Sequence, residues 1–173
     1  MITIAICGLF EVPYFSHSTI TDIVSIGDVG MQLPDLAGFA SPPTIHRFEF
    51  SDICHVAESG DKDVSPAEAD VQRLLDLFST FLARMDYSRI LFHCTAGRAR
   101  STAAAFVFCV LTGMTYEDSF RRLVRIRGPI LPNLLMIAYA DKLMGHEGRM
   151  LDFIATQRAD APEWVRRYRE VTL

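Results

Sequence analysis

The sequence predicts a single α/β domain with a central sheet of four or five mostly parallel strands flanked by helices. Three observations support this fold class. Apolar, β-branched segments typical of strands dominate the first fifty residues, and one more lies near residue 90. Segments with helical periodicity separate and follow these strands, an order typical of α/β folds. The chain has 173 residues, which suits one domain that we place at 1–173.

The strand predictions follow from local composition. Residues 1–9 form an apolar opening segment, and Asp22–Gly27 is rich in β-branched residues and ends at glycine. Ile45–Phe50 alternates apolar and polar residues, as a half-buried strand does, and Ile90–Phe92 is a short apolar run typical of a buried strand. We expect these segments to share one sheet, with helices on both of its faces.

Helices are predicted mainly from the second half of the chain. Ser65, Pro66 and Glu68 form a capping pattern, so we expect a helix from there to about Met85. Its apolar residues recur at steps of three and four, which predicts a buried face of Val71, Leu74, Leu75, Phe78, Phe81 and Leu82. Further helices are expected at Ser101–Leu111, from Thr115 to near Arg127, from Pro132 and Asn133 to Gly145, and within Arg149–Val171.

Composition excludes several classes of protein. The formal net charge is −4 and no basic run occurs, so we expect no nucleic-acid partner. No apolar stretch approaches 18 residues, and the N-terminus lacks the basic region of a signal peptide, so we expect neither a membrane span nor secretion. The four cysteines form no Cys-x-x-Cys pair, which argues against a metal site or a disulfide scaffold. These features favour a cytoplasmic protein without a cofactor.

One stretch, Arg89–Thr102, predicts the chemistry. The predicted strand Ile90–Phe92 comes first, a loop of mostly small residues follows from Cys94 to Arg100, and a helix begins near Ser101. A strand, a tight loop and a helix N-terminus together form an anion site, because loop N–H groups point inward and the helix adds partial positive charge. We therefore expect the backbone of this loop to bind an anion through Thr95, Ala96, Gly97, Arg98, Ala99 and Arg100.

Cys94 and Arg100 add a nucleophile and a binding group to this anion site. A cysteine that lies among N–H donors beside a guanidinium is favoured as the thiolate, which is its nucleophilic form. The planar guanidinium of Arg100 can bind two oxygens of a phosphate at once. This combination predicts transfer of a tetrahedral anion through a covalent intermediate on sulfur.

The segment His93–Ser101 resembles the His-Cys-x5-Arg-Ser/Thr signature of the cysteine-dependent protein tyrosine phosphatases, and most of all their compact, dual-specificity-like branch. The resemblance implies a phosphomonoester hydrolase that works through a phosphocysteine at Cys94. It also implies that Ser101 donates to the sulfur when the thiolate leaves, and that His93 orients the loop. The resemblance covers about Asp22–Met144, and it leaves the first twenty and the last twenty-five residues unexplained.

The resemblance further implies a general acid on a loop before the cysteine. Asp52 directly follows the strand Ile45–Phe50, where the dual-specificity pattern places its acid, and we rank it first. Asp61 and Asp63 lie in the same long loop and remain alternatives, in that order. Asn133 lies in a segment similar to the family's Pro-Asn segment, in which the asparagine braces the catalytic loop, although a residue at a helix start can also act only as a cap.

Three functions remain open. The first is a tyrosine or dual-specificity phosphatase that acts on phosphorylated proteins or small phosphomonoesters. The second is a phosphatase for a non-protein substrate such as a phosphoinositide or a nucleotide, because Arg98 adds positive charge to the loop. The third is a phosphate-binding module with weak turnover, which would result if none of the loop aspartates reaches the leaving group.

Overall fold

The structure is a computed structural model and describes residues 2–56, 63–84 and 88–158. Within these residues lie four strands: β1 (Ile2–Gly8), β2 (Asp22–Gly27), β3 (Thr44–Glu49) and β4 (Ser88–Cys94). A 3-10 helix, η1 (Leu9–Phe15), follows β1. The same described residues contain five α-helices: α1 (Glu68–Ala83), α2 (Arg100–Leu111), α3 (Tyr116–Arg127), α4 (Leu134–Leu143) and α5 (Arg149–Thr156).

The strands form one parallel sheet in the order β1-β4-β2-β3. The predicted sheet class is therefore confirmed, with four strands. β4 lies inside the sheet, between β1 and β2, and its last residue Cys94 is in register with Gly8 of β1. Because all four strands run in one direction, their carboxyl ends share one edge, which is where α/β folds place ligands.

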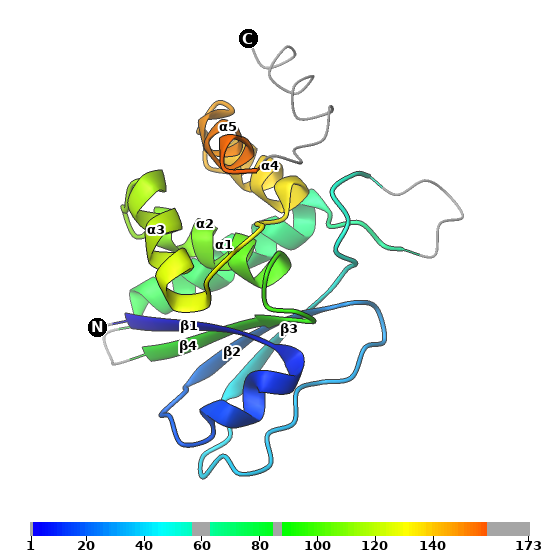
Figure 1. Cartoon of the computed structure of the whole chain (residues 1–173), viewed down its shortest axis with the longest axis vertical. Helices are drawn as coiled ribbons and strands as arrows, with labels where there is room; N and C mark the ends of the chain where they lie inside the picture. Colours follow the sequence, from blue (N-terminus) through cyan, green and yellow to red (C-terminus); the bar gives the residue numbers. More distant parts are fainter. Residues whose placement is uncertain (1, 57–62, 85–87, 159–173) are drawn as a thin grey trace.

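The two faces of the sheet are covered unequally (Figure 1). The α-helices lie on one face, where most of the buried apolar residues form the main core. The other face is covered by η1 and by the segment that joins β2 to β3, which enclose a smaller cluster of Cys7, Val12, Ile20, Ile23 and Leu91. The expected two-sided cover is thus present, but a 3-10 helix and a loop replace α-helices on one side.

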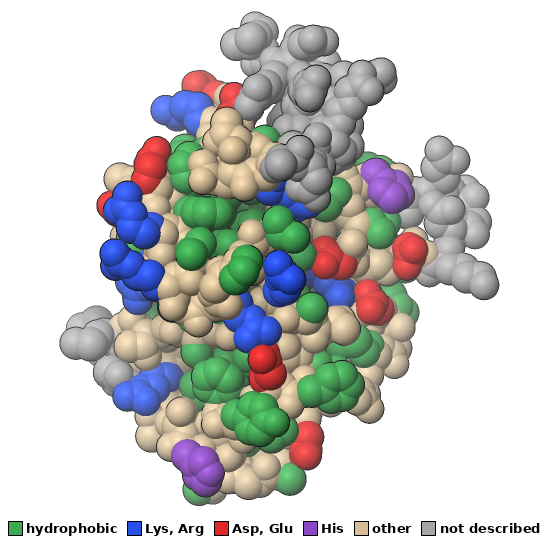
Figure 2. Space-filling model, in the orientation of Figure 1, with side chains coloured by type: hydrophobic (Ala, Val, Ile, Leu, Met, Phe, Trp, Pro, Cys, Tyr) green, Lys and Arg blue, Asp and Glu red, His purple; other side chains and the backbone are tan. Residues whose placement is uncertain are grey.

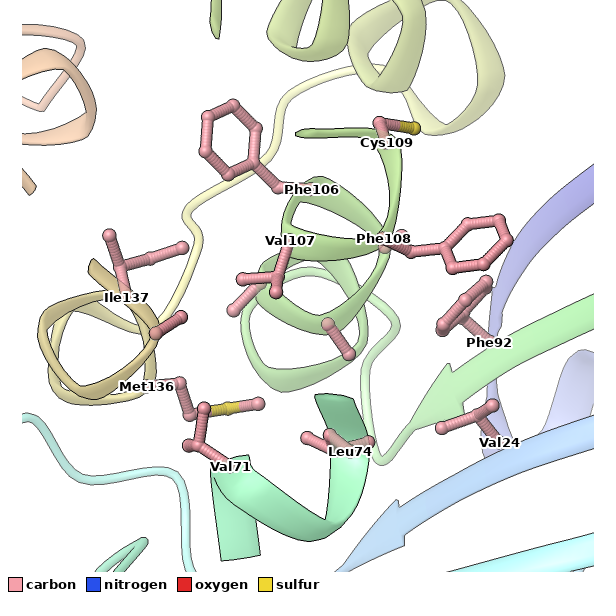
Figure 3. Packing of buried hydrophobic residues seen from close by; sticks show 14 of the residues in the cluster. Val24, Val71, Leu74, Phe92, Phe106, Val107, Phe108, Cys109, Met136 and Ile137 are labelled. Atoms are coloured by element: carbon pink, nitrogen blue, oxygen red, sulfur yellow. The ribbon is translucent and has the colours of Figure 1, made fainter. Parts of the chain in front are cut away.

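The helix α2 is the centre of the main core (Figure 3). Its residues 100–110 are all buried, as expected for a helix that is enclosed on every side. Phe108 of α2 packs edge to face against Phe78 of α1, with ring centroids 5.2 Å apart, and lies 5.9 Å from Phe92 of β4. Met136 and Ile137 of α4 lie on another side of α2. This packing fixes the N-terminus of α2 beside the end of β4.

The predicted start of α1 was wrong by about two residues. The helix begins at Glu68, because the backbone of Ala67 is still extended, and Asp70 rather than Glu68 caps it by accepting from the Ala67 N–H at 3.0 Å. Leu82, which was predicted on the buried face, is 39 % exposed, since the face turns away from the core in the last turn. Thr115 caps α3 as predicted, by accepting from the Asp118 N–H.

A buried carboxylate, that of Asp22, accepts several hydrogen bonds at the amino edge of the sheet, opposite the edge where Cys94 lies. Asp22 of β2 is 1 % exposed and accepts hydrogen bonds from His46 Nε2 at 2.9 Å, Arg84 Nη1 at 2.6 Å and Thr21 Oγ1 at 2.9 Å. Burial by itself would raise the pKa of Asp22, but the hydrogen bonds from His46, Arg84 and Thr21 outweigh it and the pKa is lowered. Asp22 therefore links β2 to β3 and to the end of α1 as an anion.

We expect Asp22→Asn to lower the free energy of unfolding by about 2–3 kcal/mol at pH 7, because it removes a buried carboxylate that accepts from the partly exposed His46 and Arg84. A lowered pKa means that Asp22 stabilises the wild type above the ordinary value of 3.8, and that this contribution is lost as the pH falls below it. Urea denaturation of both proteins at pH 7 and pH 3 measures both effects. The exposed Asp76→Asn is the control, with an expected change within about 0.5 kcal/mol. An equal loss in both variants would contradict the assigned role.

Candidate active site

The loop 95–99 joins the end of β4 to the start of α2 and lies at the carboxyl edge of the sheet. Gly97 is the residue that lets the loop turn tightly. Its φ of +71° is the left-handed conformation that favours glycine, and a Cβ there would lie 2.4 Å from the carbonyl carbon of Cys7 and 2.5 Å from the nitrogen of Gly8. The loop therefore packs directly on the end of β1, and only glycine fits at this position.

All five carbonyl groups of the loop point outward to hydrogen-bond donors. Because C=O of one residue and N–H of the next point in opposite directions across a trans peptide, the N–H groups of residues 96–100 point inward. This orientation forms the concave ring of donors expected of an anion site. The outward acceptors are Thr95 O from Leu9 N, Ala96 O and Gly97 O from Arg127, Arg98 O from Leu131 N, and Ala99 O from Asn133 N.

The sulfur of Cys94 lies at the base of this ring. Cys94 is 1 % exposed, and its Sγ accepts from the Gly97 N–H at 3.2 Å. The Ser101 hydroxyl lies 3.2 Å from the same sulfur, as the resemblance implied. Ser101 is itself buried, so its rotamer is held by packing in the first turn of α2. Cys94 is therefore directed toward the loop N–H groups and has a hydroxyl donor beside it.

Arg100 is buried to 2 % exposure and is held at both ends of its guanidinium. Nη1 donates to Asp28 Oδ1 at 2.9 Å and to the Phe50 carbonyl at 2.6 Å, and Nη2 donates to Thr95 Oγ1 at 2.8 Å. Within the described part of the chain, Nε is buried and has no hydrogen-bond partner. A buried guanidinium N–H without an acceptor is costly, so its presence beside an anion loop indicates a place for a bound oxyanion.

A second arginine supports the loop from outside. Arg127, at the end of α3, donates from Nε to Gly97 O at 3.1 Å and from Nη2 to Ala96 O at 2.9 Å. The same guanidinium pairs with Glu11 of η1, with Nη2 2.8 Å from Oε2 and Nη1 3.0 Å from Oε1. Glu11 Oε2 also accepts from the Gly8 N–H at 2.5 Å. Arg127 and Glu11 thus connect α3, η1 and the end of β1 to the loop.

His93 lies in the centre of the sheet, in register with Cys7 of β1 and Ser25 of β2. Burial, with a further contribution from the positive charges of Arg47 and Arg100, lowers the pKa of His93 to about 4. The ring is therefore neutral at pH 7. Any support that His93 gives to the loop or the sulfur comes from packing and polarity, because it carries no positive charge there.

Asp52 is fixed next to the loop by Asn133. Asn133 is fully buried, and its Nδ2 donates to Asp52 Oδ1 at 2.9 Å and to the Ile53 carbonyl at 3.0 Å. Its Oδ1 accepts from Met136 N at 3.1 Å, so it caps α4, while its own N–H donates to Ala99 O at 3.3 Å. Asn133 therefore caps α4 with its side-chain oxygen and contacts the phosphate loop through its backbone N–H, while its side-chain nitrogen holds the segment of Asp52.

The alternative acids are placed differently. Asp63 is exposed and precedes Val64, whose carbonyl accepts from Ser51 N at 2.7 Å and closes the base of the loop. Asp61 lies outside the described residues. Asp52 is therefore the candidate acid that the structure connects to the phosphate loop.

The structure adds three charged residues to the site that the sequence did not indicate: Asp28, Glu11 and Arg127. Asp28 had a usable signal, because it directly follows the predicted strand Asp22–Gly27 and so lies at the carboxyl edge of the sheet. Arg127 and Glu11 had none, since their contacts depend on how α3 and η1 pack around the loop.

The surface beside the loop mixes charge with apolar residues. Figure 2 views the molecule from the side of β1 and η1; acidic and basic side chains lie together near the middle of this face, and hydrophobic side chains gather over η1. Phe10 and Tyr14 of η1 are among the exposed large hydrophobic residues. Among the described residues, no group of three His, Cys, Asp or Glu side chains is arranged to hold a metal ion, and no helix is long and apolar enough to cross a membrane.

Comparison with known proteins defines the fold. No family model and no curated protein sequence matches the chain. Among solved structures, human DUSP28 is similar with a TM-score of 0.57 at 12 % identity, covering 90 % of this chain and 95 % of that one. The human tyrosine phosphatase-like serine/threonine/tyrosine-interacting protein also gives 0.57, at 19 % identity with 79 % and 83 % coverage. PTPMT1 in complex with PI(5)P gives 0.53 at 12 % identity, with 90 % and 94 % coverage.

These neighbours share the sheet and helix arrangement over most of both chains. The protein therefore has the fold of these phosphatase and phosphatase-like structures, which is the fold that the resemblance of the segment His93–Ser101 implied. At these identities the comparison establishes the architecture, and the chemistry rests on the residues described above.

Proposed function

We propose that this protein is a phosphomonoester hydrolase, a tyrosine or dual-specificity phosphatase that acts through a phosphocysteine at Cys94. One observation carries the proposal: the Cys94 sulfur lies beneath a loop whose carbonyls all point outward, next to a buried arginine with an unpartnered Nε. A thiol in this position combines a nucleophile with donors for the oxygens of a tetrahedral anion. The phosphatase fold of the neighbouring structures supports the same reaction class.

In the first step, Cys94 Sγ attacks the phosphorus atom of the substrate. The S–P bond forms while the bond from phosphorus to the leaving oxygen breaks. Arg100 and the N–H groups of residues 96–100 hold the three equatorial oxygens, on which charge is concentrated. Asp52, in its protonated form, gives its proton to the leaving oxygen. The products of this step are a free alcohol or phenol and phosphocysteine.

In the second step, a water molecule attacks the phosphocysteine. Asp52, now a carboxylate, takes a proton from the water as the new P–O bond forms. The S–P bond breaks, inorganic phosphate is released, and the sulfur leaves as a thiolate. The Ser101 hydroxyl, 3.2 Å from Sγ, donates to the sulfur and stabilises this departing thiolate. No metal ion or cofactor takes part in either step.

We expect Asp52→Asn to lower kcat for an alkyl phosphate by about 10²–10⁴, the usual contribution of a positioned acid. The asparagine keeps the size of the side chain and can still contact Asn133, so binding of inorganic phosphate should change little. A phosphate ester with a good leaving group, such as p-nitrophenyl phosphate, needs less protonation and should be affected less. Steady-state kinetics on both substrates measures the difference.

The matched control is Asp63→Asn, an exposed aspartate of the same loop, which should retain wild-type rates on both substrates. If Asp63→Asn or Asp61→Asn loses turnover and Asp52→Asn does not, the acid has been assigned to the wrong aspartate.

Two other functions have specific support. A non-protein phosphomonoester is a candidate because Arg98 is an exposed positive charge within the loop and because the similar PTPMT1 structure is a complex with PI(5)P. A phosphate-binding module is a candidate because another similar structure is described as a phosphatase-like interacting protein. Comparing kcat/KM on a phosphopeptide, a phosphoinositide and a nucleotide separates these functions, and a binder would show saturable affinity without turnover.

We further propose that the chain acts as a single catalytic domain in the cytoplasm, with phosphorylated proteins or small phosphomonoesters as partners and no nucleic acid. The four cysteines are all free thiols, which suits a reducing compartment and a reaction that needs an unoxidised Cys94. The net charge of −4 offers little attraction for a nucleic acid.

A further inference from the structure

We infer that Arg127 and Glu11 form a positioning pair that holds the middle of the phosphate loop in its anion-binding conformation. Arg127 sets the orientation of the two central peptide groups, and Glu11 sets the orientation of Arg127. The inference deepens the proposed function, on which it rests, because it assigns to residues of α3 and η1 the preorganisation of a loop between β4 and α2. Neither residue needs to touch the substrate.

The carbonyls of Ala96 and Gly97 depend on this arginine in a way that the other loop carbonyls do not. Thr95 O, Arg98 O and Ala99 O accept from backbone N–H groups of Leu9, Leu131 and Asn133, which are fixed by the chain. Among the described residues, the donors to Ala96 O and Gly97 O are two nitrogens of one side chain, Nη2 and Nε of Arg127. A single side chain thus controls two consecutive peptide groups.

The orientation of these peptide groups matters for binding. Rotating the Ala96–Gly97 peptide would turn its N–H away from Cys94 Sγ, which it now contacts at 3.2 Å, and would direct a carbonyl oxygen toward the anion. Rotating the Gly97–Arg98 peptide would have the same effect on the next donor. Gly97, at φ +71°, lacks the steric restriction that would prevent such rotations in other residues. The loop therefore needs an external constraint at this point.

Glu11 holds the guanidinium of Arg127 in the orientation that the loop needs. Its Oε1 accepts a hydrogen bond from Nη1 of Arg127 at 3.0 Å, and its Oε2 lies 2.8 Å from Nη2 as an ion pair, so both carboxylate oxygens face the guanidinium. The Gly8 N–H holds the same carboxylate from the end of β1. The hydrogen bond from Arg127, and then that from Gly8, lower the pKa of Glu11, so it is ionised at neutral pH. Arg127 is only partly exposed, which limits screening of the pair by solvent.

The test compares Arg127→Gln and Glu11→Gln with Arg125→Gln, an exposed arginine of the same helix. Three quantities are measured: the inhibition constant of vanadate, the pH midpoint of iodoacetate alkylation at Cys94 followed by mass spectrometry, and the melting temperature. We expect Arg127→Gln to weaken vanadate about 10-fold to 100-fold, as loss of an oriented donor does, and to move the alkylation midpoint upward. Glu11→Gln should act in the same direction with a smaller change, and Arg125→Gln should match the wild type.

Two further variants separate positioning from general stability. Arg127→Lys keeps the charge but cannot donate to both carbonyls and to Glu11, so it should rescue vanadate binding only in part. The double variant Glu11→Gln/Arg127→Gln should lose little more than Arg127→Gln alone, because the two residues act through the same contacts. Full rescue by lysine, or additive losses in the double variant, would contradict the inference.

The inference is overturned if Arg127→Gln lowers the melting temperature but leaves both vanadate inhibition and the alkylation midpoint unchanged, since the pair would then be structural only. Alkylation does not require turnover. If the wild type hydrolyses no phosphate ester, the proposed function fails, while the effect of Arg127 on the loop is still measured by alkylation and by equilibrium binding of inorganic phosphate. The two hypotheses are therefore tested separately.

Discussion

Cys94→Ser is expected to reduce hydrolysis of an aryl phosphate by at least about 10⁴, because an alcohol is a far weaker nucleophile than a thiolate, and the hydrogen-bond partners of Sγ among the described residues, the Gly97 N–H and the Ser101 hydroxyl, are not bases that could activate it. The loop N–H groups and Arg100 remain, so inorganic phosphate should still bind. The serine variant is therefore expected to separate binding from chemistry. Turnover is measured by steady-state kinetics and binding by isothermal titration with phosphate.

The control for this variant is Cys54→Ser, which changes a partly buried cysteine outside the loop and should keep wild-type activity. Cys7 and Cys109 are poor alternative nucleophiles, since burial raises the pKa of Cys7 to about 12 and that of Cys109 to about 11. If Cys94→Ser kept more than a few per cent of the activity, the phosphocysteine mechanism would have to be abandoned.

The second large effect is expected for Arg100→Lys, which should lower kcat/KM by at least about 10³. Loss of one preorganised donor to a developing negative charge costs about 10²–10³, and lysine cannot replace a planar guanidinium that binds Asp28, Phe50 and Thr95 and still presents Nε. In contrast to Cys94→Ser, this variant should also lose affinity for phosphate and vanadate, because the guanidinium is itself part of the anion site.

Arg125→Lys provides the comparison for Arg100→Lys, since Arg125 is exposed on α3 and the same chemical change there should have no effect on kcat/KM. The two active-site variants together give a diagnostic pattern: chemistry lost with binding kept for Cys94, and both lost for Arg100. An Arg100→Lys protein with normal vanadate inhibition would show that the loop N–H groups alone bind the anion.

The ion pair between Arg100 and Asp28 is one of three contacts that orient the guanidinium of this arginine. Asp28 and the Phe50 carbonyl both accept from Nη1, so this nitrogen is held by the ends of β2 and β3. Nη2 is held by Thr95 within the loop. Three segments therefore orient the guanidinium before a substrate binds. This preorganisation reduces the conformational entropy that the side chain loses on binding.

Local sequence was sufficient for most of the secondary structure. The strand predicted at Asp22–Gly27 is present with the same bounds, and the helix predicted at Ser101–Leu111 begins one residue earlier. The caps of α3 and α4 at Thr115 and Asn133 were also predictable, because short polar side chains at these positions bond to nearby backbone N–H groups. The start of α1 was harder to predict. Two capping patterns overlap there, Ser65 with Glu68 and Ala67 with Asp70, and the structure uses the second.

The sequence by itself was enough to predict the candidate site of this protein. The order of strand, small-residue loop and helix, with Cys94 at one end of the loop and Arg100 at the other, predicts an anion site with a nucleophile, because these features depend on residues close together in the chain. Only the tertiary structure decided which distant side chains support that site. Arg127 is thirty residues beyond Gly97, and Asp28 is seventy-two residues before Arg100, so their contacts exist only because the parallel sheet and the docking of α3 bring them together.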